Sequence, residues 1–114
     1  MANKYDSLKI DCLEDIAPVN ASSSWTITDS RTETITITGA ILPDGYFVYG
    51  YAVYWADGRT SASLPSAERG KFRTQREASL HALGFLSQFL PYFTPESRND
   101  ILHAERSLAQ DHLF

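Results

Sequence analysis

The chain has 114 residues, a length typical of one domain, and a formal net charge of −4 at pH 7. Its single cysteine excludes an intrachain disulfide and a four-thiolate zinc site. The longest uncharged apolar run, residues 45–56, is far shorter than the roughly 20 residues of a membrane-spanning helix. The first residues carry no apolar stretch of the kind found in secretion signals, so we expect a cytoplasmic protein without a membrane partner.

Residues 1–20 are expected to form an irregular segment ahead of the sheet. Asp11 and Glu14 have the spacing of a capping box, which would start a short helical turn that ends before Pro18. An edge strand over residues 5–10 is the alternative.

A four-stranded antiparallel meander is predicted over residues 25–64. Its strands cover residues 25–28, 34–38, 46–55 and 60–64. The second strand alternates isoleucine with threonine, which places Ile35 and Ile37 on the core face. Short connections between successive strands favour antiparallel neighbours.

Asp57 and Gly58 predict a two-residue type I′ hairpin loop between the last two strands. In that register Trp55 lies opposite Thr60. The predicted core face then carries Phe47, Tyr49, Tyr51, Val53, Trp55, Ala62 and Leu64. The other face, with Tyr46 and Tyr54, is smaller and is expected to be partly solvated.

Two helices follow, over residues 75–90 and 95–112. Thr74 and Glu77 form a capping box for the first helix, and Pro91 ends it. Thr94 caps the second helix, with Pro95 at its first position. We expect the first helix to cover the apolar sheet face through Phe85 and Phe89, and the second to pack beside it or against another subunit. The fold class is therefore α+β: residues 1–114 form a single domain in which a four-stranded antiparallel meander is covered on one face by a C-terminal helix, with a second C-terminal helix.

Motifs for chemistry are missing from the sequence. There is no phosphate loop, no dinucleotide-binding glycine pattern and no nucleophile elbow. The three histidines, His81, His103 and His112, do not have the spacing of metal ligands on one helix face. We expect a non-enzymatic protein without catalytic residues, metal or cofactor, with an enzyme site assembled without a motif as the alternative.

Positive charge is concentrated in residues 46–90, which hold five basic and three acidic side chains in an otherwise acidic chain. The basic residues are Arg59, Arg69, Lys71, Arg73 and Arg76. A helix N-terminus with neighbouring cations can hold phosphate, and Tyr46 and Tyr54 would offer stacking surfaces for bases. These seven residues predict a nucleic-acid-binding module, for DNA or RNA, acting through the basic strand-to-helix loop. The alternatives are a solvated mixed-charge loop, or a protein–protein interaction or homodimeric module without a nucleic-acid role.

The motif Gly70-Lys71-Phe72-Arg73, followed by Glu77-Ala78 and Ala82-Leu83, resembles the start of the last helix in double-stranded-RNA-binding domains. The resemblance implies an order of helix, three strands and helix, with basic residues at the helix start that bridge phosphates. This chain departs from the family in having four predicted strands, an added C-terminal helix and no lysine pair. As a whole it is similar to small proteins carried by bacterial mobile elements.

A homodimer is the expected assembly. The aromatic strand has a partly apolar second face, and the last helix has little left to cover within one subunit. Surplus apolar surface of this kind is most often buried in a symmetric dimer.

Overall fold

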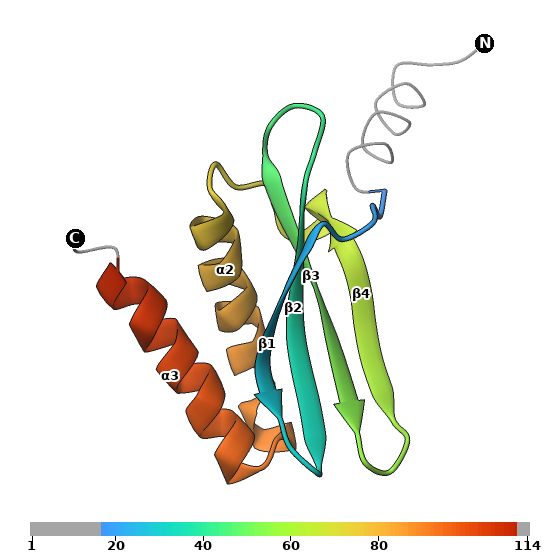
Figure 1. The fold of residues 1–114 in the computed structure, drawn as a ribbon, viewed down its shortest axis with the longest axis vertical. Coiled ribbons are helices and arrows are strands. Elements are labelled where there is room, and N and C mark those ends of the chain that lie inside the picture. The colour runs from blue at the N-terminus through green and yellow to red at the C-terminus, as the bar shows by residue number, and fades with distance from the viewer. Residues whose placement is uncertain (1–16, 112–114) are drawn as a thin grey trace.

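The computed structural model describes residues 17–111, which form an antiparallel sheet with two helices packed beside it (Figure 1). The strands are β1 (Ser23–Asp29), β2 (Glu33–Ile41), β3 (Phe47–Trp55) and β4 (Thr60–Ser66), and they neighbour one another in that order. The 3₁₀-helix η1 (Ala67–Arg69) precedes α2 (Gln75–Ser87), and η2 (Leu90–Tyr92) precedes α3 (Pro95–Asp111). The predicted α+β class and meander are confirmed. The capping box at Asp11 and the last predicted helical residue, 112, lie outside the described residues.

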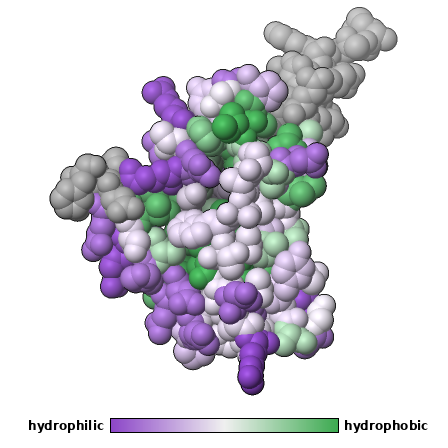
Figure 2. All heavy atoms as spheres, in the orientation of Figure 1, coloured by the Kyte–Doolittle hydropathy of each residue, from purple (hydrophilic) through white to green (hydrophobic). Residues whose placement is uncertain are grey.

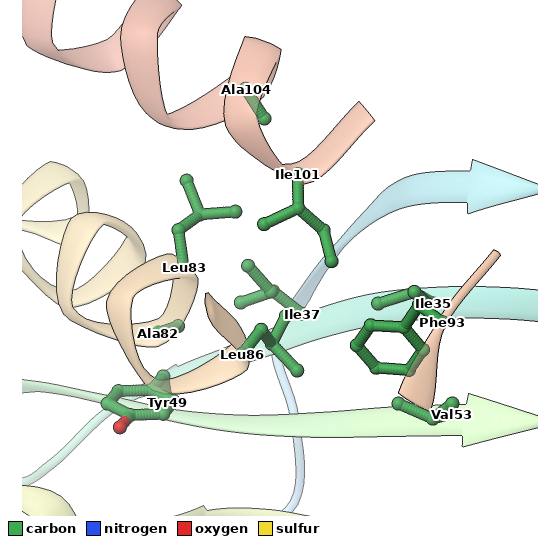
Figure 3. Packing of buried hydrophobic residues seen from close by; sticks show 10 residues of the cluster. All are labelled: Ile35, Ile37, Tyr49, Val53, Ala82, Leu83, Leu86, Phe93, Ile101 and Ala104. Carbon is green, nitrogen blue, oxygen red and sulfur yellow. The ribbon is translucent and has the colours of Figure 1, made fainter. Parts of the chain in front are cut away.

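The core forms where β2 and β3 meet the helices. Ile35 pairs with Val53 across the two strands, and both side chains are buried on the helix side. Above them lie buried apolar side chains from both helices (Figure 3). The core cluster consists of Ile35, Ile37, Tyr49, Val53, Ala82, Leu83, Leu86, Phe93, Ile101 and Ala104. Its centre on α2 is therefore Leu83 and Leu86, whereas the expected anchors Phe85 and Phe89 lie at its margin.

The ends of α2 follow from the sequence. The Thr74 hydroxyl accepts a hydrogen bond from the Glu77 backbone N–H at 3.1 Å, as the predicted cap requires. The helix ends at Ser87, three residues earlier than predicted. Pro91 explains the earlier end, because a proline ring clashes with the carbonyl four residues before it and offers no N–H.

The second helix has a partner within the same chain. α3 contacts α2 along its length and β1 at the sheet edge, and it buries Ile101 and Ala104. This packing corresponds to the first of the two arrangements expected for the second helix.

The β3–β4 hairpin differs from the prediction by one residue. Tyr54 pairs with Thr60, and the Trp55 N–H donates to the Arg59 carbonyl at 2.9 Å, so the loop has three residues, 56–58. Among the described residues positive φ occurs only at glycines, so Asp57 does not have the conformation that a type I′ turn needs, while Gly58 has φ +93°. The predicted pairs Val53–Ala62 and Tyr51–Leu64 are therefore wrong.

In the observed register, the side chains of β4 lie on the opposite faces of the sheet from those predicted. Ser61 and Ser63 pair with Val53 and Tyr51 and so lie on the helix side of the sheet. Ala62 and Leu64 lie on the opposite face, which we call the open face. A one-residue change in the loop thus replaces two apolar side chains by two serines beside the core.

Gly50 permits an irregularity further along the same pair of strands. The β3–β4 register shifts between Tyr49 and Tyr51. A Cβ atom at Gly50 would come within 2.6 Å of the Pro65 nitrogen and 2.7 Å of the Leu64 carbonyl carbon. Only glycine allows the two backbones to approach this closely.

Candidate binding groove

An aromatic-lined groove lies between β4 and the end of α2. We call it the aromatic groove. Its lining residues are Tyr51, Val53, Trp55, Ser61, Phe85, Leu86, Phe89, Tyr92 and Phe93, and its volume is about 90 Å³. Phe89 is 39% exposed and Tyr92 is 73% exposed, so two large aromatic rings of the groove face solvent. Apolar concavities with exposed aromatic rims are typical of binding sites.

The groove exists because of where the helices sit and which side chains β4 presents. α2 packs on β3 and β2, and α3 packs on β1, which leaves the helix side of β4 without a comparable cover. Ser61 and Ser63 are too small to fill the space. The corrected register of the hairpin is therefore the direct cause of the opening.

Arg69 lies at one end of the aromatic groove. Its guanidinium carbon is 4.5 Å from the centre of the Phe85 ring and 5.4 Å from that of Tyr51. Its only side-chain hydrogen bond among the described residues is a long one, 3.5 Å, to the Ser63 hydroxyl. No carboxylate of the described chain forms an ion pair with it, so this half-buried cation retains hydrogen-bonding capacity for an anion.

Arg59 lies at the other end. Its guanidinium carbon is 5.0 Å from the Trp55 ring centre, and its Nε donates to Asp57 at 2.7 Å. The groove continues here into a wider, polar hollow that shares Trp55, Tyr92 and Phe93 with it. Hydrogen bonds from the Arg59 backbone and side chain outweigh the effect of desolvation and lower the pKa of Asp57.

The predicted basic set is not brought together in one place. Arg59 precedes β4 and Arg69 follows it, and their guanidinium groups lie over Trp55 and Tyr51, about 13 Å apart along β3. Lys71 donates to Asp44 at 2.8 Å and lies 5.8 Å from the Tyr46 ring, beside the β2–β3 hairpin. This hydrogen bond from Lys71 is the largest of the effects that lower the pKa of Asp44.

The remaining two cations have different surroundings. Arg76 donates two hydrogen bonds, at 3.1 and 3.0 Å, to the Leu108 carbonyl and thereby ties α2 to α3. The Arg73 side chain is exposed at the start of α2 and makes no hydrogen bond or ion pair with the described chain. Of the five predicted cations, Arg73 is the one whose side chain is exposed and has neither a hydrogen-bond nor an ion-pair partner in the described chain.

Tyr54 lies on the open face of the sheet and is 50% exposed, far from the strand-to-helix loop that contains Arg69, Lys71 and Arg73. This face consists mainly of small side chains, with Thr36 paired to Ala52 and Ala52 to Ala62. In the view of Figure 2 most of the surface is of intermediate hydropathy, and strongly hydrophobic atoms gather over the β2–β3 hairpin, where Ile41 is 59% exposed.

Two buried polar side chains in the interior have structural partners. The Tyr49 hydroxyl and the His81 Nδ1 are 3.0 Å apart, and burial raises the pKa of Tyr49. Glu33 is 3% exposed, and its carboxylate accepts hydrogen bonds from Trp55 and Thr94. Each bond satisfies a group that would otherwise be costly to bury, which accounts for both residues without a catalytic role.

Within the described part of the chain, no three His, Cys, Asp or Glu side chains gather in a way that would hold a metal ion. None of the helices in residues 17–111 is long and apolar enough to cross a membrane.

The groove residues were not identified from the sequence as a site. The sequence pattern predicts Phe85 and Phe89 as core residues and indicates no role for Tyr92. A signal was present: Phe89 and Tyr92 continue the apolar stripe that contains Phe85 beyond Ser87, where α2 ends. Aromatic residues beyond the end of a core helix can remain partly exposed, and here they do.

Comparisons with protein-family models, with curated proteins and with solved structures found no match. The resemblance to double-stranded-RNA-binding domains therefore stays a prediction.

Proposed function

We propose that this protein is a non-enzymatic binding module and that its ligand is a segment of polypeptide held in the aromatic groove. The observation that carries the proposal is the position of Arg69, a half-buried guanidinium stacked on Phe85 at the end of an apolar groove, with no carboxylate partner in the described chain. A ligand that combines an apolar side chain with a carboxylate satisfies both features. Peptides with alternating side chains do so readily.

Nucleic acid is the second candidate ligand, and the exposure of Arg73 beside the start of α2 favours it. Lys71 and Tyr46 lie together near the same end of the sheet. However, Lys71 is already paired with Asp44, and Arg76 is engaged by the Leu108 carbonyl. The number of cations left for phosphates is small, and affinity for nucleic acid depends on that number.

The proposed homodimer would use a different surface. Tyr54 and Leu64 are both exposed on the open face, where they flank the small side chains of Ala52 and Ala62. Two open faces stacked on each other would bury these rings and methyl groups. Because the aromatic groove lies on the opposite side of the sheet, a dimer of this kind leaves the groove accessible.

A display selection with random peptides tests the proposed function. Peptides that are enriched on the immobilised full-length chain are resynthesised with a fluorescent label, and their binding is measured by anisotropy. We expect the Phe89→Ala variant to lose most of the binding and the Leu102→Ala variant to retain it. Leu102 is a matched control, because it is also an exposed apolar residue but lies on α3.

The same assay includes short single- and double-stranded DNA and RNA at low and moderate salt. Two results together would favour nucleic acid over a peptide as the ligand. The selection would enrich no peptide whose binding depends on Phe89, and nucleic acid would bind in a salt-sensitive way that Arg73→Gln weakens. Peptide binding that is unaffected by Phe89→Ala would place the ligand elsewhere on the molecule and overturn the proposal.

A further inference from the structure

The geometry points to a specific ligand and binding mode that rest on the proposed function. The ligand is an extended peptide that adds to β4 as a fifth strand, with an acidic, an apolar and an acidic side chain at alternate positions on the face turned to the aromatic groove. The acidic side chains meet Arg69 and Arg59, and the apolar one enters the groove between them.

The outer edge of β4 is available for strand addition. β4 is the last strand of the sheet (Figure 1). At its far end the Val19 backbone N–H donates to the Pro65 carbonyl at 2.9 Å, and among the described residues no backbone hydrogen bond reaches the outer edge of residues 60–64. The Trp55 N–H donates to the Arg59 carbonyl, so these two residues form a hydrogen-bonded pair of the β3–β4 ladder. Hydrogen-bonded and non-hydrogen-bonded pairs alternate in antiparallel strands, so the next pair, Tyr54 with Thr60, is a non-hydrogen-bonded one. Thr60, Ala62 and Leu64 therefore direct their backbone N–H and carbonyl groups away from β3.

The two arginines set the charge pattern of the ligand. Asp57 engages the Nε of Arg59, so the ligand carboxylate is met by the two terminal nitrogens of that guanidinium. Arg69 stands over Tyr51 and Arg59 stands over Trp55. Tyr51 and Trp55 are four residues apart on β3, which corresponds to about 13 Å along a strand. Same-face side chains in an extended peptide recur every second residue, so carboxylates at positions i and i+4 match the two guanidinium groups.

The middle side chain of the peptide, at position i+2, enters the aromatic groove. A side chain at i+2 lies above Ser61 and Ser63, which are short enough to let it reach the ring of Phe89 and the cavity of about 90 Å³ next to it. A leucine side chain suits this apolar, aromatic-walled space. The lining offers the Ser61 hydroxyl and the Tyr51 phenol, which are hydrogen-bonded to each other at 3.2 Å.

The test uses a labelled peptide with the core sequence Glu-Thr-Leu-Thr-Glu, flanked by Gly-Ser at both ends. The pattern reads the same in both directions, so the result does not depend on whether the added strand is parallel or antiparallel. Binding to the full-length chain is measured by anisotropy. We expect lysine in place of both glutamates, or glutamine in place of leucine, to weaken binding by about tenfold or more.

On the protein side, Arg69→Gln is compared with Arg73→Gln, which removes an exposed cation from the same loop but outside the groove. We expect about a tenfold loss for the first variant and less than about a twofold change for the second. Thermal melting of both variants verifies that they fold.

N-methylated peptides test strand addition itself without altering the protein. One peptide is methylated at the two threonine amides and the other at the leucine and second glutamate amides. Only every second amide of an added strand donates to β4, so we expect one of these peptides to lose binding and the other to keep it. Equal behaviour of the two peptides would overturn strand addition.

The outcomes separate this inference from the proposed function. Peptides from the display selection that need Phe89 but lack acidic residues, and bind equally after Arg69→Gln, would overturn the charge pattern and leave the peptide-binding function standing. If no peptide binds and the β4 edge is buried in a self-associated form, the edge pairs with a second copy of this chain. That result would overturn both the proposed peptide-binding function and the strand-addition inference.

Discussion

Glu33 at the start of β2 holds Thr94 at the start of α3. One carboxylate oxygen of Glu33 accepts the Thr94 backbone N–H at 3.0 Å and the Thr94 hydroxyl at 2.9 Å, and the other accepts the Trp55 indole N–H at 3.0 Å. A negative charge at the N-terminus of a helix also interacts favourably with the helix dipole. This single buried carboxylate therefore attaches α3 to the sheet.

We expect Glu33→Gln to lower the free energy of unfolding by about 1.5–3 kcal/mol at pH 7, because hydrogen bonds to a buried charged acceptor are lost or weakened. Urea denaturation measures the change. Glu68→Gln, at an exposed glutamate, serves as the control and should have little effect.

The same residue predicts a loss of stability in acid. Burial acts to raise the pKa of Glu33, but hydrogen bonds from Ser97, Thr94 and Trp55 outweigh it and hold the pKa below the ordinary value of 4.5. A lowered pKa stabilises the folded state fully above pH 4.5, and this contribution disappears as the pH falls through the folded-state pKa. The difference in stability between the wild type and Glu33→Gln should therefore be smaller at pH 3 than at pH 7, and an unchanged difference would contradict the assignment.

Gly50→Ala should destabilise the protein by about 1–3 kcal/mol, because its Cβ atom would collide with backbone atoms that cannot move aside. Gly84 is the matched control. It lies in the middle of α2 with no atom within 4 Å of an added Cβ, so Gly84→Ala should raise stability by up to about 1 kcal/mol through helix propensity. Thermal unfolding of the two variants should shift in opposite directions.

Core and groove positions on α2 should respond differently to truncation. Leu86 is 1% exposed, and Leu86→Ala should cost about 2–5 kcal/mol. Phe89 makes its contacts at the solvent-exposed rim, so Phe89→Ala should cost clearly less than Leu86→Ala in spite of its larger side chain. Chemical denaturation that ranks Phe89 above Leu86 would mean that the aromatic groove is part of the core.

The homodimer is tested by light scattering at high micromolar concentration, where we expect twice the monomer mass of 12.8 kDa. Replacement of Tyr54 and Leu64 by serine should restore the monomer if the open faces pair. A monomer mass for the wild type would contradict the dimer directly.

Much of the fold could be predicted because local signals agreed with one another. The isoleucine–threonine alternation of β2 and the cap at Thr74 each specify one element, and the structure has them where expected. The hairpin register was missed because an Asp-Gly pair suits both a two-residue loop and the last two positions of a three-residue loop. The local sequence does not distinguish these loops, since the choice depends on which faces of β4 the rest of the fold can accept.

The candidate site was harder to predict, because it depends on relations between distant segments. Arg59 and Arg69 are ten residues apart in a basic stretch, yet their guanidinium groups lie about 13 Å apart along β3. Their common feature is that each stands over an aromatic side chain of β3, which only the three-dimensional arrangement reveals. Charge counts along the chain indicate a basic region but not which cations are already paired.

The length of the loop at 56–58 affects how a protein with this fold can evolve. Shortening it by one residue, for example to Asn-Gly, would slide β4 by one position and bring Leu64 and Ala62 beneath the end of α2. The groove would then be filled from within the same chain, although none of its own residues had changed. The length of a solvent-exposed turn thus sets whether this fold keeps a vacant site or a closed interior, and insertions and deletions there would affect ligand binding more than most substitutions in the groove itself.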